Sequence, residues 1–384
     1  MKFLEDFLEQ QKRKNLYRKT ITYEPIDATH VKIDGKIYLN LASNNYLGLT
    51  NHPDVKQAAI NAISKYGTGS GAARLITGTH PYYLSLEQEI ADFKSAEAAI
   101  VFNTGYMANV GTISALMDKN DVIFSDELNH ASIIDGCRLS KAKCVVFRHS
   151  DMEHLEECLS ENTCSGKRLI VVDGVFSMRG DIAQLPDIVK LAKKYNVLVM
   201  VDDAHATGVL GKGRGTAAHF GLEGQIEIQM GTLSKALASE GGYVAGSKDL
   251  ISYFINKARS FIYSTALSPT TVAAALESLK IIKSDSNFVS VLNKNSVYMR
   301  NKLRETGLNI PQGITPIIPI VIAKEKEVLK VAENLREAGL IITAIRPPTV
   351  PENESCLRIT VSAAHDINDL NIASKKIALS MKKI

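Results

Sequence analysis

The chain alternates between short apolar runs and longer amphipathic segments. The apolar runs are bounded by polar residues or glycine and lie at 98–102, 121–124, 143–147, 169–172, 197–201, 226–230 and 241–246. Runs of this length are typical of strands buried on both faces of a parallel sheet. Amphipathic segments at 53–66, 82–93 and 130–139, and one starting near 107, predict helices between them. The alternation predicts an α/β fold with a doubly wound, mostly parallel sheet.

Both ends of the chain have a different pattern. Residues 3–19 predict a helix, and Asp34-Gly35 between alternating segments predicts a hairpin. After about residue 280 the pattern predicts a smaller α+β domain, with a helix at 288–305, a strand at 316–322, a helix at 325–338, strands at 341–345 and 356–361, and a last helix from 368. We therefore expect an N-terminal element at 1–43, a large domain at 44–280 and a small domain at 281–384.

Composition excludes several classes of protein. A chain of 384 residues with 45% hydrophobic and 22% charged residues is ordinary for a globular protein of two or three domains. A net charge of +4 is too small to indicate a nucleic-acid partner. No apolar run reaches membrane-spanning length, and the five cysteines have no paired spacing, so we expect a cytoplasmic protein without structural disulfides.

Three polar residues follow two of the predicted strands. Asp202 and His205 come directly after the run at 197–201, and Lys235 comes after a turn of small residues that follows the run at 226–230. Ligands of open α/β sheets bind at the carboxyl ends of the strands, so these residues are candidates for a functional site. A lysine in an enclosed site is a nucleophile, and a lysine with an acidic residue is what pyridoxal 5'-phosphate (PLP) requires. Taken singly, each residue is also compatible with a surface lysine or a helix cap.

Further candidate residues lie at the same carboxyl ends of the predicted strands. His130 and Ser177 both follow predicted strands, and the strand at 98–102 leads through Gly105 and Tyr106 into a helix. The amino end of a helix binds phosphate well, because its N–H groups are free and its dipole is positive there. The glycines at 67–71 follow a helix instead of a strand, so they do not match a dinucleotide-binding fingerprint. His149 and His154 lack the spacing of metal ligands, and we expect no metal.

The sequence resembles the fold type I PLP enzymes and, among them, the α-oxoamine synthases. The matching segments span nearly the whole chain and lie at 44–48, 128–132, 173–177, 201–205, 231–235 and 362–365. The resemblance implies that a PLP-bound amino acid condenses with an acyl thioester and loses carbon dioxide. The segment 346–351 resembles that of members which join L-alanine to a pimeloyl thioester for biotin synthesis. It is less similar to that of members which transfer an acetyl group to glycine.

The resemblance also implies a role for each site residue. Lys235 would bind the aldehyde of PLP, Asp202 would pair with the ring nitrogen, His130 would stack on the ring, and His205 and Ser177 would hydrogen-bond its hydroxyl oxygen. The phosphate would be held by Gly105, Tyr106 and Thr232, and by Ser264 and Thr265 of a partner subunit, which implies a homodimer. The substrates would be held by Arg18, Asn44, His130, Arg346 and Thr349.

Three alternatives remain open at this stage. A sister synthase would use glycine or another acyl donor, an aminotransferase would need a keto-acid acceptor, and a non-catalytic relative would lack some of the groups named above. One position departs from the family pattern, because Arg179 stands where an acidic residue is expected. We expect little effect of Arg179 on the chemistry and a possible effect on how the acyl donor is handled.

Overall fold

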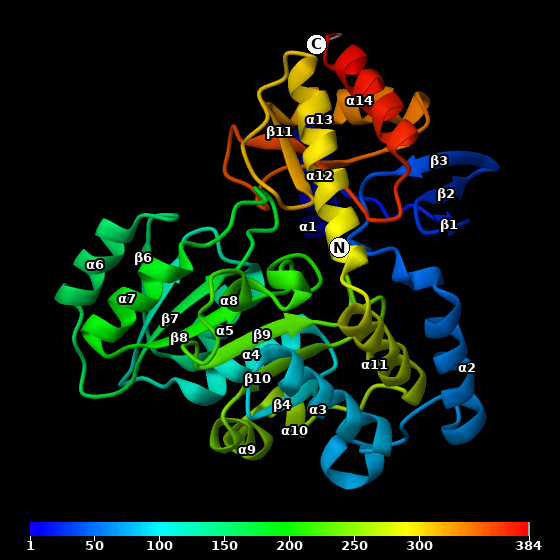
Figure 1. Cartoon of the computed structure of the whole chain (residues 1–384). Coiled ribbons are helices and arrows are strands. Elements are labelled where there is room, and N and C mark those ends of the chain that lie inside the picture. Colours follow the sequence, from blue (N-terminus) through cyan, green and yellow to red (C-terminus); the bar gives the residue numbers. More distant parts are fainter. Residues whose placement is uncertain (383–384) are drawn as a thin grey trace. The chain divides into compact units, whose positions relative to one another are not determined.

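The computed structural model describes residues 1–382, which divide into two compact units. The larger unit comprises Leu49–Ser177 and Asp181–Ser290. The smaller unit comprises Met1–Gly48, Met178–Gly180 and the chain from Val291 onward. Figure 1 labels the helices and strands of both units where there is room. Within residues 1–382, no helix is long and apolar enough to cross a lipid bilayer.

The larger unit is built on one sheet with the strand order β4-β10-β9-β8-β7-β5-β6, of which Figure 1 labels all strands except β5. These strands are β4 (Ala98–Phe102), β5 (Val122–Asp126), β6 (Lys143–Phe147), β7 (Arg168–Asp173), β8 (Leu198–Asp202), β9 (Ile228–Thr232) and β10 (Gly242–Gly246). Strands β9, β8, β7, β5 and β6 run parallel to one another, whereas β10 is antiparallel to both β4 and β9. The prediction of a mostly parallel α/β sheet is confirmed.

The described residues of the larger unit also contain ten helices. They are α2 (Pro53–Tyr66), α3 (Pro81–Lys94), α4 (Gly105–Leu116), α5 (Ala131–Ser140), α6 (Met152–Glu161), α7 (Leu185–Tyr195), α8 (Thr216–His219), α9 (Lys248–Lys257), α10 (Arg259–Ile262) and α11 (Pro269–Ser284). Of these, α4 to α8 lie between successive strands of this sheet. Short turns of helix occur at η1 (Leu49–Asn51), η2 (Arg74–Gly78) and η3 (Gly211–Gly213). The sequence pattern predicts α2 to its last residue, but it does not predict α6, α7 or α9.

Both faces of the sheet are covered by helices, which explains the continuous apolar runs. In β7, Leu169 and Val171 belong to a buried cluster that includes side chains of α4, α5 and α9. The alternate residues Ile170 and Val172 belong to a second buried cluster, which includes side chains of α6 and α7. Successive side chains of a strand point to opposite faces, so a strand covered on both sides must be apolar at every position.

The smaller unit contains two sheets. One has the order β1-β2-β3-β12 and the other the order β11-β14-β13. Its strands are β1 (Glu24–Pro25), β2 (His30–Ile33), β3 (Lys36–Asn40), β11 (Ile317–Ala323), β12 (Leu340–Ile341), β13 (Thr343–Ile345) and β14 (Ser355–Thr360). The helices are α1 (Lys2–Arg13), α13 (Glu325–Glu337), α14 (Ile367–Met381) and most of α12 (Asn287–Glu305). One buried cluster joins apolar side chains of α12, α13 and α14 to those of β11 and β14.

Two predictions for the smaller unit were wrong in their boundaries. The N-terminal helix ends at Arg13 instead of continuing to residue 19, because Asn15 adopts a positive φ of 56° that ends the last turn. Arg18 therefore lies in a non-helical segment. The predicted strand at 341–345 is divided between two sheets, since β12 pairs with β3 and β13 pairs with β14.

Candidate active site

Three neighbouring strands of the larger unit end at the same edge of the sheet. Strand β7 ends at Asp173, β8 at Asp202 and β9 at Thr232. Asp173 lies opposite Asp202 in the parallel register, and Asp202 lies opposite Met230. The polar groups at these strand ends are therefore brought together by the strand register alone, at the edge where α/β sheets bind ligands.

Lys235 lies on the turn that connects β9 to β10. The turn is closed by hydrogen bonds from Leu233 N to Gly241 O (3.0 Å) and from Ser239 N to Leu233 O (2.9 Å). Ala238 N also donates to Lys235 O (3.1 Å), which fixes the backbone of the lysine itself. The side chain of Lys235 is half-buried, so the turn presents an amine at a defined place beside the strand ends.

A cavity of about 230 Å³ lies at these strand ends. Of the residues predicted for the site, the cavity brings together Gly105, Tyr106, His130, Asp202, His205, Thr232 and Lys235. The lining also includes residues that the sequence analysis did not assign to the site, namely Thr104, Asn109, Ser132, Asp173, Ala204, Met230 and Ser234. All of these residues belong to the larger unit.

The Asp202 carboxylate is buried and held through both of its oxygens. Its Oδ1 accepts a hydrogen bond from Ala204 N (2.8 Å), and its Oδ2 accepts one from Asn109 Nδ2 (2.7 Å). Only 3% of the residue is exposed. Donors at both oxygens fix the orientation of the carboxylate. A carboxylate held in this way beside a cavity suits a positively charged ring nitrogen.

His130 connects the cavity to the start of α5. Its Nδ1 lies 2.7 Å from Ser132 Oγ, and its backbone N donates to Asp173 Oδ2 (2.8 Å). Burial lowers the pKa of His130, Asp202 opposes this shift, and Lys235 adds to it. The imidazole is therefore neutral at physiological pH, and a flat, uncharged ring faces the cavity.

Asp173 is the second carboxyl group at the strand ends. Burial, reinforced by the charge of Asp202, raises the pKa of Asp173 well above its usual value. Two carboxylates at neighbouring strand ends repel each other, so the proton is held more tightly on Asp173. Of the two carboxyl groups, Asp202 therefore supplies the negative charge that acts on a ligand.

One end of the cavity is formed by the start of α4. Thr104 caps this helix by accepting a hydrogen bond from Met107 N (3.0 Å). The N–H groups of Gly105 and Tyr106 are the first of the helix and have no acceptor within it. A Cβ atom at Gly242 would lie 2.7 Å from Gly105 Cα, so glycine at 242 lets β10 approach the helix start closely. This arrangement is suited to binding a phosphate.

Thr232 completes this end of the cavity. Its Oγ1 donates to Gly241 O (2.8 Å), lies 2.7 Å from Ser234 Oγ and accepts a hydrogen bond from Ser234 N (3.3 Å). The hydroxyl is thus fixed in position at the end of β9.

These groups together fit PLP. Lys235 contributes an amine for the aldehyde, Asp202 a buried carboxylate for the ring nitrogen, and α4 a helix amino end for the phosphate. Among the described residues, no group of three or more His, Cys, Asp or Glu side chains is arranged to hold a metal ion.

Three predicted residues of the larger unit lie outside the lining of this cavity. Ser177 follows β7 and is half-buried. Ser264 Oγ donates to Thr265 O (3.4 Å), and the same carbonyl accepts a hydrogen bond from Asn103 Nδ2 (2.6 Å). Thr265 is exposed, so its side chain remains accessible.

The predicted substrate residues Arg18, Asn44, Arg346 and Thr349 all belong to the smaller unit. Arg346 donates to the carbonyl oxygen of Asn15, and Arg18 Nη2 donates to Pro347 O (3.3 Å). Burial lowers the pKa of Arg346, and the nearby charge of Arg18 lowers it further. The two guanidinium groups therefore lie close together and form a positive site.

The other two substrate residues have fixed surroundings in the same unit. Asn44 Oδ1 accepts hydrogen bonds from both terminal nitrogens of Arg358, each at 3.2 Å. Thr349 N donates to Arg346 O (3.1 Å), which closes a turn at the start of the 346–351 segment. Arg179 is exposed in the short segment of this unit between residues 178 and 180.

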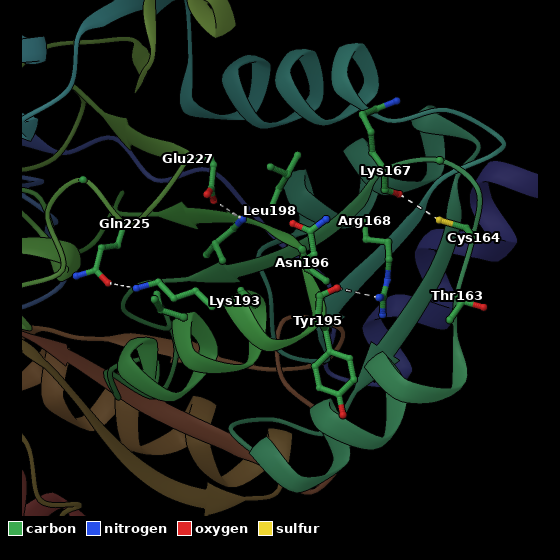
Figure 2. Close-up of a pocket in the computed structure, with 16 residues that line it drawn as sticks. Thr163, Cys164, Lys167, Arg168, Lys193, Tyr195, Asn196, Leu198, Gln225 and Glu227 are labelled. Atoms are coloured by element: carbon green, nitrogen blue, oxygen red, sulfur yellow. Dashed lines mark hydrogen bonds between the residues drawn. The ribbon is translucent and has the colours of Figure 1, made fainter.

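A larger hollow of about 810 Å³ lies at the other edge of the sheet, at the amino ends of β7 and β8 (Figure 2). Its polar side chains bond to one another and to the backbone. Lys193 Nζ donates to Gln225 Oε1 (2.6 Å), Glu227 Oε2 accepts from Val199 N (2.8 Å), and Arg168 Nη1 donates to Tyr195 O (3.2 Å). These are structural contacts, and we assign the chemistry to the smaller cavity.

Comparison with known proteins identifies the family. Residues 36–377 match the model of the aminotransferase class I and II family. The chain is 48% identical to the 8-amino-7-oxononanoate synthase of Thermoanaerobacter pseudethanolicus, over 97% of this chain and 95% of that protein. It is 50% identical to the 8-amino-7-oxononanoate synthase of Lysinibacillus sphaericus, over 96% of this chain and 95% of that protein.

A solved structure extends the comparison to the fold. A variant of serine palmitoyltransferase from S. paucimobilis with bound PLP and myriocin matches with a TM-score of 0.94 and 31% identity, over 99% of this chain and 97% of that chain. These matches cover nearly the whole length of both chains in each comparison. The chain therefore belongs to the aminotransferase class I and II family and, within it, to the 8-amino-7-oxononanoate synthases.

Proposed function

We propose that the protein condenses L-alanine with a pimeloyl thioester and releases carbon dioxide, the thiol carrier and 8-amino-7-oxononanoate, a step of biotin biosynthesis. The carrier is coenzyme A or a carrier protein. One observation carries this proposal: a lysine, a buried carboxylate and the amino end of α4 line a single cavity. This is the set of groups that PLP needs, and the 48–50% identical relatives are 8-amino-7-oxononanoate synthases.

When bound, PLP supplies a ring that accepts the electrons released as bonds to the alanine Cα break. Lys235 Nζ would hold the aldehyde carbon until the alanine amine takes its place. The freed Nζ would then take the Cα proton and later return a proton to the product. Asp202 would pair with the protonated ring nitrogen, because its carboxylate is fixed in position by two donors.

The remaining groups of the larger unit would orient the cofactor. A neutral His130 can lie against the ring without adding positive charge, which would otherwise compete with Asp202. His205 and Ser177 would donate hydrogen bonds to the ring hydroxyl oxygen. The free N–H groups of Gly105 and Tyr106 would hold the phosphate with the Thr232 hydroxyl, since a helix amino end favours an anion.

The positive site of the smaller unit would bind the two carboxylates of the substrates. Arg346 would form a forked pair with the alanine carboxylate, a geometry that a guanidinium fits. Arg18 would attract the far carboxylate of the pimeloyl chain, which an acetyl donor lacks. Asn44 and Thr349 would border the substrates.

We further propose an obligate homodimer in the cytoplasm, in which Ser264 and Thr265 reach the phosphate in the partner subunit. The exposure of Thr265 is compatible with such a contact. Light scattering tests the dimer, and a fully active monomer would refute it. We retain 1–43, 44–280 and 281–384 as the proposed functional domains.

The proposed reaction is tested by measuring release of the thiol carrier with alanine, glycine and serine, each against pimeloyl-CoA, a pimeloyl carrier protein and acetyl-CoA. We expect alanine with a pimeloyl donor to be fastest, with one carbon dioxide released per thiol. If glycine with acetyl-CoA is faster at equal concentrations, the protein is an acetyltransferase. Conversion of bound PLP to its amine form by a keto acid would instead indicate an aminotransferase.

A further inference from the structure

Hydrogen bonds connect Asp202 to His130 through two other side chains of the larger unit. Asn109 Nδ2 donates to Asp202 Oδ2 (2.7 Å) and also to Ser132 Oγ (2.8 Å). Ser132 Oγ in turn lies 2.7 Å from His130 Nδ1. Asn109 and Ser132 are each only 1% exposed, so water does not compete for these bonds.

The donor and the acceptor of each hydrogen bond between Asp202 and His130 follow from the groups involved. An ionised Asp202 can only accept, so the Asn109 amide nitrogen faces it and donates its second hydrogen to Ser132. The hydrogen of the Ser132 hydroxyl is then left for His130 Nδ1. The backbone N–H of Ser132 also donates to this Nδ1 (3.3 Å), which requires Nδ1 to be an acceptor. The neutral His130 ring therefore carries its proton on Nε2.

The orientation of Asn109 depends on the charge of Asp202. Asn109 Oδ1 has no hydrogen-bond partner among residues 1–382, so it does not fix the amide. A flipped amide would place this oxygen against Asp202 Oδ2 and would leave both Asp202 and Ser132 without their donor. The amide therefore remains in its observed orientation as long as Asp202 is ionised.

The packing of α4 against α5 brings Asn109 to Ser132. Asn109 lies one turn after Gly105, and Ser132 lies in the first turn of α5. A Cβ atom at Gly136 would lie 3.2 Å from Asn109 O and 3.1 Å from the Ile113 side chain. Glycine at 136 thus permits the close approach of the two helices that the Asn109–Ser132 bond requires.

We propose that Asn109 is a positioning residue, which holds the Asp202 carboxylate toward the cofactor ring nitrogen and, through Ser132, orients the His130 ring that lies against the cofactor. The proposal rests on the proposed function, because it takes Asp202 and His130 as the groups that contact PLP. Asn109 itself need not touch PLP. A single amide would then set the geometry of two PLP contacts.

The first test compares Asn109→Leu with Thr112→Val. Leucine is close to asparagine in size and has no donor. Thr112 lies three residues further along α4, is fully buried, and its hydroxyl has no hydrogen-bond partner in the described chain, so Thr112→Val is a matched control. PLP affinity is measured by equilibrium dialysis between about pH 5.5 and 9 for both variants and the wild type.

We expect Asn109→Leu to weaken PLP binding by about tenfold, the effect of losing one charge-assisted hydrogen bond. The loss of PLP affinity on acidification should also begin at a higher pH, because the ionised form of Asp202 has lost a donor. The Thr112→Val variant should stay within about twofold of wild type. A general structural defect would weaken binding without moving the pH profile.

The second test uses the protein without cofactor. Labelling the nine histidines with ¹⁵N and identifying the His130 signal through a His130→Gln variant reports which ring nitrogen carries the proton. Wild type should show the Nε2-protonated neutral ring. Asn109→Leu and Ser132→Ala should both change the His130 signal, and Thr112→Val should not. Asn109→Ser, which is too short to bridge the two partners, replaces Asn109→Leu if the leucine variant does not fold.

The proposal is overturned if Asn109→Leu has the PLP affinity and pH profile of the Thr112→Val control, or if the His130 signal is unchanged in both Asn109→Leu and Ser132→Ala. If the wild type binds PLP but does not condense alanine with any thioester, the proposed function falls and the result for Asn109 stands. If the wild type binds no PLP, both fall.

Discussion

Replacing Lys94 with methionine should destabilise the protein more than any exposed lysine substitution. Lys94 is the last residue of α3, and its Nζ donates to Asp203 Oδ2 and to Arg214 O, both at 2.6 Å. The side chains of Lys94 and Asp203 are both 0% exposed. Burial acts to lower the pKa of Lys94, but the Asp203 carboxylate outweighs it and holds the pKa above its usual value. The pair is therefore charged at neutral pH.

The size of the effect follows from what remains in Lys94→Met. The aliphatic part of the side chain is retained, so little packing is lost. The Asp203 carboxylate keeps its hydrogen bond from Thr216 Oγ1 (2.6 Å) but loses its counter-charge inside the protein. Removing one partner of a buried ion pair costs about 3–5 kcal/mol of unfolding free energy. Asp203 directly follows Asp202, so this pair also supports the strand end that carries the active-site carboxylate.

The assay is urea unfolding at pH 7, followed by circular dichroism, for Lys94→Met, Asp203→Asn and the double variant. Each single change leaves one buried charge unpaired, whereas the double variant leaves none. The loss of unfolding free energy in the double variant should therefore be smaller than the sum of the two single losses by about 2 kcal/mol or more. The exposed Lys56→Met in α2 is the control and should stay within about 0.5 kcal/mol of wild type. Losses that add in the double variant, or a loss below about 1 kcal/mol for Lys94→Met, would refute the reasoning.

Three further outcomes are expected. Burial opposes protonation of His149, but hydrogen bonds to Asp126 and Asp181 outweigh it and raise the pKa of His149 to about 9. Protonated His149 therefore stabilises the folded state fully below about pH 6.5, and this stabilisation is lost as the pH rises through 9. Asp181 is 41% exposed, and water screens its interaction with His149, so we expect the unfolding free energy in urea to fall by only about 2 kcal/mol between pH 6.5 and 9.5. His149→Gln should lack this fall, and an equal pH dependence in that variant would contradict the assignment. Arg300 donates to three backbone carbonyls of the smaller unit, and Arg300→Met removes this donor. The unfolding free energy measured by thermal unfolding should fall by about 3 kcal/mol or more. A near-neutral change would show that water replaces the guanidinium. Lys235→Ala should unfold like wild type but lose turnover. In the wild type, borohydride reduction followed by peptide mapping should find the cofactor on Lys235 and on no other lysine.

The local pattern of the sequence determined most of the elements of the fold. Strands β4 and β6 and helix α2 begin and end at the predicted residues, since an apolar run, or a proline at the start of a helix, acts over only a few neighbouring positions. The edge of the sheet that carries the cavity was also predictable. Parallel strands share one carboxyl end, so Asp202 and Lys235 could be placed together before any contact was known.

Contacts between distant segments decided the rest. No local pattern shows that residues 340–341 pair with β3 instead of joining 343–345 beside β14, because β3 lies near the other end of the chain. The same reason hid Asn109 from the sequence analysis. Within α4 it is one of several polar residues between apolar ones, and its role arises only when α5 and the end of β8 pack against it. Hydrophobic periodicity records which face of an element is buried, whereas the partner of a buried polar group is set by tertiary packing alone.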